Sequence, residues 1–110
     1  MAVGITTHVL DTSRGRPASG VPVLLEVWDG SWQAAGRAWT DEDGRANPLE
    51  IPLREGTWKI TFDLAAWFGP QGIESFYPEA SIVFHVRDAG QKYHVPLLLS
   101  PFGYSTYRGS

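Results

Sequence analysis

Short runs of β-branched and aromatic residues, separated at regular intervals by turn-forming residues, run through the whole of this sequence. The segment Val21–Trp28 shows the pattern, because Val23, Leu25 and Val27 alternate with other residues and so share one face of a strand. Asp29-Gly30 follows as a strong signal for a hairpin turn. Such strands bury their apolar faces by packing sheet on sheet, so the pattern predicts an antiparallel β-sandwich.

Seven or eight strands and one short helix are expected along the chain. Asp63 is placed to cap the helix at residues 64–68, which Gly69-Pro70 would end. A short edge strand at residues 49–53 would be weakened by Pro48 and Pro52. The other expected strands cover residues 5–10, 21–28, 32–40, 58–62, 81–86, 93–99 and 104–108.

The composition fits a single domain, residues 1–110, in which 43% hydrophobic residues suffice for a core. A net charge of -3 without a basic block argues against nucleic acid as a partner. The absence of cysteine excludes disulfides and thiolate zinc sites. We expect no membrane association, because no stretch approaches the roughly 20 apolar residues of a spanning helix. Residues 1–5 lack the features of a secretory signal, so we expect a cytoplasmic protein.

Three histidines lie in expected strands: His8, His85 and His94. A lone histidine in a strand usually has no catalytic role, but the residues around His94 favour a functional role for it. The turn at residues 100–103 folds the tail back along the strand of His94, which brings His94 beside residues 107–110. A guanidinium there, that of Arg108, would disfavour the protonated imidazole and make His94 a base near neutral pH.

Other chemistries find less support. Three histidines can bind zinc, but no two of them are spaced i,i+2 or i,i+4 and nearby arginines would repel a cation, so no metal is expected. No serine lies in a G-x-S-x-G motif, and no phosphate-binding or dinucleotide-binding motif is present. Taken alone, Arg45 is most simply a solvated loop residue, and the five tryptophans are expected in the core or in subunit contacts.

Taken together, five segments resemble the transthyretin-like 5-hydroxyisourate hydrolase family, and the resemblance extends over essentially the whole chain. The terminal Tyr107-Arg108-Gly109-Ser110 distinguishes the hydrolases of this family from the hormone-carrying transthyretins of the same fold. The segments are Ile5–Asp11, Arg14–Ala18, Thr40–Arg45, Glu74–Glu79 and Tyr93–Ser110.

The resemblance implies an all-β, transthyretin-like antiparallel β-sandwich of two four-stranded sheets with one short helix. It also implies a homotetramer, built as a dimer of dimers, with active sites in the channel between the dimers. The implied reaction is the hydrolytic ring opening of 5-hydroxyisourate to 2-oxo-4-hydroxy-4-carboxy-5-ureidoimidazoline in urate degradation. No metal or cofactor is implied.

The family's functional residues fall on His8, Arg45, His94 and the four-residue tail. Either histidine would deprotonate the attacking water, and the residues leave open which one does. Arg45 and Arg108 would hold ring oxygens and stabilise negative charge. Ser110 would orient a histidine or the water, and Tyr107 and Gly109 would complete the substrate-binding set.

One departure from the family is visible at Lys92, where many relatives have a histidine. Because residues two apart in a strand share a face, Lys92 is expected beside His94, where it would alter the local charge and shift the pH profile at most.

Two other functions remain open. A carrier of the same fold would bind a small aromatic ligand in the inter-dimer channel without chemistry. A purely structural sandwich domain would tolerate loss of the tail. A carrier has no need of two histidine bases and two guanidiniums, which favours the hydrolase.

Overall fold

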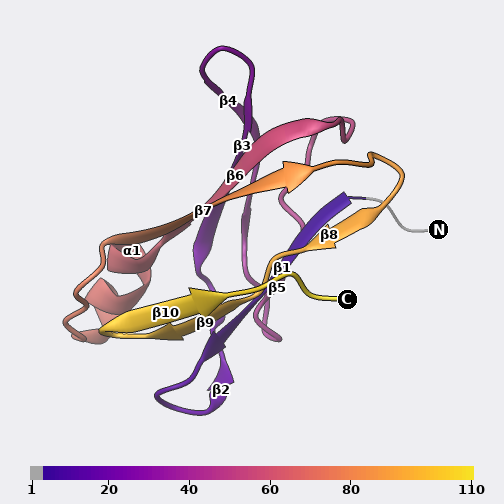
Figure 1. Ribbon diagram of the computed structural model, residues 1–110. Coiled ribbons are helices and arrows are strands. Elements are labelled where there is room, and N and C mark those ends of the chain that lie inside the picture. Colours follow the sequence, from indigo (N-terminus) through magenta and orange to yellow (C-terminus); the bar gives the residue numbers. More distant parts are fainter. Residues whose placement is uncertain (1–3) are drawn as a thin grey trace.

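Two β-sheets pack face to face in the computed structural model, which describes residues 4–110 (Figure 1). The expected domain also includes residues 1–3, which lie outside the described residues. The elements are β1 Gly4–Asp11, β2 Arg16–Pro17, β3 Pro22–Trp28, β4 Trp32–Trp39, β5 Arg45–Ala46, β6 Gly56–Asp63, α1 Leu64–Phe68, a 3-10 turn Gly69–Gln71, β7 Glu79–Val86, β8 Lys92–His94, β9 Leu97–Ser100 and β10 Gly103–Thr106.

One sheet has four antiparallel strands in the order β4-β3-β6-β7. The predicted alternation in β3 is confirmed, because Val23, Leu25 and Val27 are all buried. In the ladder, Leu25 lies opposite Ile60 and Val27 opposite Trp58, both buried residues of β6. The inward faces of β3 and β6 therefore form the centre of the core.

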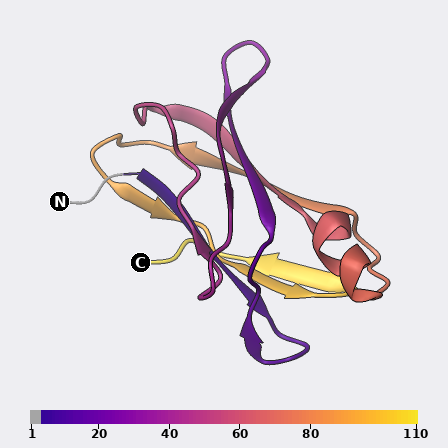
Figure 2. The ribbon, with the colours of Figure 1, turned by 180° about the vertical axis from the view of Figure 1, so that it is seen from behind.

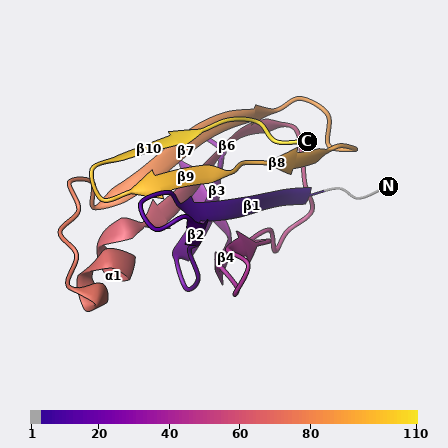
Figure 3. The same cartoon turned by 90° about the horizontal axis from the view of Figure 1, so that it is seen from below.

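The second sheet is built around β1, which lies between several short partners (Figure 3). β1 pairs in antiparallel fashion with β2 and β5, and in parallel with β8 and β9. The expected strand 93–99 is divided in two at Val95 and Pro96, where the proline has no N–H to donate. The predicted fold class is confirmed, but this sheet differs from the expected four antiparallel strands. It counts six strands, because it includes short pairings that the sequence pattern did not show, and β1 pairs with β8 and β9 in parallel.

Residues 49–53 do not form the short edge strand that was expected. Leu49, Ile51 and Leu53 instead pack against the core from an irregular segment. This segment is tied to β4 at Glu50, whose N–H donates to the carbonyl of Ala35 at 2.9 Å. The two prolines that weakened the expectation explain the missing ladder.

The predicted helix is confirmed at α1, and the Asp63 carboxylate accepts the N–H of Ala66 at 3.0 Å as its N-cap. The helix lies at the opposite end of the sandwich from both termini of the described chain (Figure 2). No helix within residues 4–110 has the length and apolar character needed to cross a lipid bilayer.

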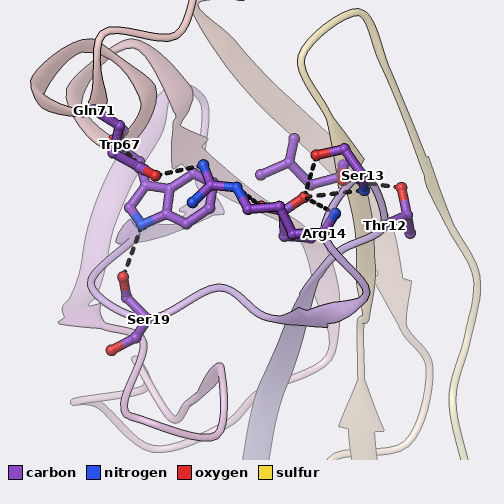
Figure 4. Close-up of polar contacts among 8 residues, drawn as sticks. Thr12, Ser13, Arg14, Ser19, Trp67 and Gln71 are labelled. Atoms are coloured by element: carbon purple, nitrogen blue, oxygen red, sulfur yellow. Dashed lines mark hydrogen bonds and ion pairs between the residues drawn. The ribbon is translucent and has the colours of Figure 1, made fainter.

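The loop after β1 is fastened to this helix by Arg14 (Figure 4). The Arg14 guanidinium pairs with the buried Asp11 carboxylate at 3.0 Å, donates to the side chain of Gln71, and lies over the Trp67 ring. The Trp67 indole N–H in turn donates to the carbonyl of Ser19 at 2.7 Å. This arginine is therefore occupied with structural contacts at the helix end of the molecule.

Candidate active site

β1 gathers the predicted site residues on the outer face of its sheet. Within β1, Ile5, Thr7 and Val9 are fully buried, so the intervening residues point away from the core. His8 lies opposite Arg45 of β5, and Thr6 pairs with His94 of β8. Because paired residues project to the same side of a sheet, His8, Arg45 and His94 share this outer face.

A tight turn delivers Arg45 to its place beside β1. The Asp41 carboxylate accepts the N–H groups of Asp43 at 2.9 Å and of Arg45 at 3.0 Å. Gly44 has a φ of +78°, and a Cβ built there would lie 2.4 Å from the Val9 carbonyl oxygen. Only glycine fits this close approach, which explains the Asp-x-x-Gly-Arg spacing in physical terms.

The imidazole of His94 is held from two sides. Its Nδ1 lies 2.8 Å from the hydroxyl oxygen of Thr6. On the other side lies Gly109 of the tail, whose N–H donates to the His94 carbonyl at 2.9 Å. A Cβ at residue 109 would lie only 2.5 Å from Cδ2 of the His94 ring, so the bare glycine allows the tail to lie against the ring.

The pKa of His94 lies below the ordinary value for histidine. Burial is the largest cause, followed by the positive charges of Lys92, His8 and Arg45. A lowered pKa keeps the imidazole neutral at neutral pH, as a general base requires. The direction agrees with the sequence prediction, but the charges responsible are those of Lys92, His8 and Arg45, and Arg108 is not among them.

A shallow cavity of about 440 Å³ opens over this face. Lys92 and His94 both line it, which confirms that the lysine and the histidine share a face. Their pairing partners in β1, Gly4 and Thr6, are likewise two residues apart. The cavity therefore combines the His94 imidazole with two cations, Arg45 and Lys92, and with the Asp41 carboxylate, which accepts N–H groups of its own turn. This combination is suited to a strongly polar ligand. Its lining residues are Thr6, Thr7, Trp39, Asp41, Arg45, Ala46, Asn47, Lys92 and His94.

The tail reaches His94 as predicted, but two of its side chains point elsewhere. Residues 94 and 109 form a bridge, so Gly109 shares the face of His94 and Arg108 projects to the opposite side. The Arg108 guanidinium lies 4.6 Å from the centre of the Tyr93 ring and donates to the Gln91 side chain at 3.2 Å.

Arg108 and Tyr107 thus line a second cavity, of about 380 Å³. His94 lines both cavities and lies between them. Ser110 is exposed at the end of the tail. The structure therefore brings His8, Arg45, His94 and Gly109 together, whereas Tyr107 and Arg108 line the second cavity and not the first.

Thr6 and Trp39 both line the cavity, although neither was predicted as a site residue. Thr6 carried a usable signal, because it precedes His8 by two residues in a strand and so shares its face. Trp39 was expected in the core or in a subunit contact, and only its place directly before the Arg45 turn pointed toward the site. Within residues 4–110, no three histidine, aspartate or glutamate side chains gather as the ligands of a metal would.

Comparison with known proteins gives consistent matches. The sequence model of the HIUase/Transthyretin family matches residues 5–109. The 5-hydroxyisourate hydrolase of Mus musculus is 43% identical, over 96% of this chain and 94% of the mouse protein. The uric acid degradation bifunctional protein TTL of Arabidopsis thaliana is 47% identical over 96% of this chain, which spans only 37% of that longer protein.

Solved structures match over nearly the whole fold. The 5-hydroxyisourate hydrolase of Klebsiella pneumoniae superimposes with a TM-score of 0.87 at 36% identity, covering 99% of this chain and all of that one. The transthyretin of Sparus aurata superimposes with a TM-score of 0.90 at 26% identity, covering 98% and 97%. The backbone is therefore shared by a hydrolase and a transthyretin, and the side chains of the site must distinguish the two functions.

Proposed function

This chain belongs to the HIUase/Transthyretin family, and we propose that it is a 5-hydroxyisourate hydrolase whose active site is the outer-face cavity around His94. The observation that carries the proposal is the convergence of His8, Arg45 and His94 from three separate segments onto one face of the β1 sheet. A hydrolase needs a base and fixed positive charge at one point, and this face supplies both.

In the proposed mechanism His94 is the general base. Its Nδ1 faces Thr6, so the Nδ1–H can donate a hydrogen bond to the Thr6 hydroxyl oxygen, which leaves the lone pair of Nε2 free. Nε2 takes a proton from a water molecule as the water oxygen bonds to the ring carbonyl carbon. A base positioned in this way contributes about 10² to 10⁴-fold to the rate.

The positive groups of the cavity stabilise the charge that develops. As water adds, the carbonyl oxygen becomes an oxyanion, and Arg45 and Lys92 are the cations that line the cavity. The ring C–N bond then breaks, and the proton held by His94 passes to the departing ring nitrogen. His8, paired with Arg45 in the ladder, stands as the second histidine of the site.

The tail acts from the other side of His94. Gly109 lies against the imidazole, and we propose that Arg108 and Tyr107 bind a part of the substrate that extends past His94 from the second cavity. Ser110 would orient the water or a histidine, as the family resemblance implies. No metal or cofactor enters this sequence of steps.

We further propose that residues 1–110 form one hydrolase domain that assembles into a homotetramer, a dimer of dimers. Two features support association: within residues 4–110, β7 pairs only with β6 and β10 only with β9, so both are sheet edges, and large aromatic side chains near them are exposed. These are Phe76, Tyr77, Phe102, Tyr104 and Tyr107. The cytoplasmic location stays a prediction, which cell fractionation would test.

The proposal is tested by following the ultraviolet absorbance of 5-hydroxyisourate, generated in situ from urate by a urate oxidase. We expect the protein to accelerate the decay and to form the ring-opened product in equal amount. Decay at the spontaneous rate with a correctly assembled protein would favour the carrier function instead, in which the same cavity binds a small ring compound unchanged.

A further inference from the structure

Trp39 is a large apolar side chain that the fold leaves in solvent at the edge of the cavity. It ends β4 and is 68% exposed, so it contributes little to the core. It lines the same cavity as Arg45 and His94. An indole held at such a place is typical of a binding surface, because its flat apolar face gains by being covered.

The backbone beneath Trp39 is firmly held. Trp39 lies opposite Pro22 in the β3–β4 ladder. The next residue, Thr40, is buried, and its hydroxyl donates to the Ala18 carbonyl at 2.6 Å and accepts the Val21 N–H at 2.9 Å. The indole therefore projects from a rigid base, which reduces the entropy lost when a ligand packs against it.

The other lining residues of the cavity are polar, charged or small. His94, Arg45 and Lys92 offer polar or charged groups, which meet the oxygens at the rim of a heterocycle. A flat ring also gains from an aromatic partner on its face. Trp39 is the aromatic residue that lines this cavity.

We propose that Trp39 is a substrate-binding residue, which stacks its indole on the flat face of the ring while the charged groups hold its edge. This inference rests on the proposed function and adds the substrate class. The site selects rings that present a planar ureide face with oxygens at the rim over saturated cyclic amides of the same size. The indole touches the ring but takes no part in proton transfer, so its removal weakens binding more than it slows the chemical step.

Steady-state kinetics on three variants test the stacking. Loss of a base-stacking aromatic costs about 5- to 100-fold in binding, so Trp39→Ala should raise KM by such a factor with kcat within about 3-fold. Trp39→Phe keeps an aromatic face and should keep KM within about 3-fold. Trp28→Ala is the matched control, since Trp28 is also exposed, at 50%, but packs on Trp32 outside the cavity.

Calorimetric titration with urate, a flat ring that the proposed reaction does not consume, separates this inference from the proposed function. Urate binding that is weakened in Trp39→Ala supports the stacking even if the wild-type protein proves inactive. Equal KM and equal urate affinity in the wild type and Trp39→Ala overturn the stacking even if the protein is an active hydrolase. A protein that neither binds urate nor turns over 5-hydroxyisourate overturns both.

Discussion

Replacing Gly109 by alanine should displace His94, the proposed general base, without replacing any titratable residue. Gly109 lies on the tail, and its N–H donates to the carbonyl of His94 at 2.9 Å. A Cβ added here would meet the His94 ring at 2.5 Å from Cδ2 and 3.2 Å from Cγ, and would also meet Pro96 at 3.3 Å. Neither the ring nor the proline can yield freely, because the ring is hydrogen-bonded to Thr6 and Pro96 is buried.

The size of the effect follows from these distances. Carbon atoms pack best at about 3.5 to 4.0 Å, so the His94 ring or the tail must move by roughly 1 Å. A displacement of about 1 Å at a reacting group costs on the order of 10²-fold in rate. If the tail moves instead, the backbone hydrogen bond is lost, at about 0.5–1.5 kcal/mol of folding free energy. We therefore expect kcat to fall by about 100-fold with a small loss of stability.

The assay is the ultraviolet decay of 5-hydroxyisourate, with thermal unfolding measured in parallel. Gly103→Ala provides the control in the same hairpin, because the nearest atom to a Cβ there is the Ser100 hydroxyl oxygen at an ordinary 3.7 Å. The control should retain wild-type activity. A Gly109→Ala enzyme with kcat within about 3-fold of the wild type would refute the claim that the tail positions His94.

Three further predictions concern single side chains. Thr6→Val removes the partner of His94 Nδ1 and should lower kcat/KM by about 3- to 10-fold, with Thr6→Ser restoring it; equal losses in both variants would argue against this hydrogen bond. Lys92→Met removes a cation that lowers the pKa of His94, so that pKa should rise and the acidic limb of the pH–rate profile should move to higher pH; an unmoved or opposite limb would contradict the assignment of His94. Trp58→Ala leaves a cavity at a fully buried site and should lower the free energy of unfolding, measured in urea, by about 3–5 kcal/mol. A loss under about 1 kcal/mol would contradict the placement of Trp58 in the packed core.

Periodicity and turn chemistry predicted the local structure because both act over a few residues. The alternation in β3 placed Val23, Leu25 and Val27 in the core, and Asp63 capped α1 as its side chain allows. The short turn after β9 predicted that the tail returns to His94, and the bridge to Gly109 confirms it. Each of these inferences needed only neighbouring residues.

Pairings between distant strands carry no such local signal. Nothing in the sequence pattern indicates that β1 runs parallel to β8 and β9, or that Arg45 and Ala46 form a strand. The side to which the Arg108 side chain projects depends on the pairing of residue 94 with residue 109. The turn at residues 100–103 does not by itself fix this register, and a slip of one residue would reverse the side. Trp39 was expected in the core or in a subunit contact, and the core is wrong, because this residue ends an edge strand and is exposed.

The most direct test of the hydrolytic site at His94 compares His94→Ala with Gln33→Ala in the 5-hydroxyisourate decay assay. Gln33 is exposed on β4, in the other sheet, and lines neither of the two cavities at His94. We predict that the wild type and Gln33→Ala accelerate the decay equally, while His94→Ala loses about 10² to 10⁴-fold of that acceleration. Undiminished turnover by a folded His94→Ala protein would contradict the assignment of His94 as the base.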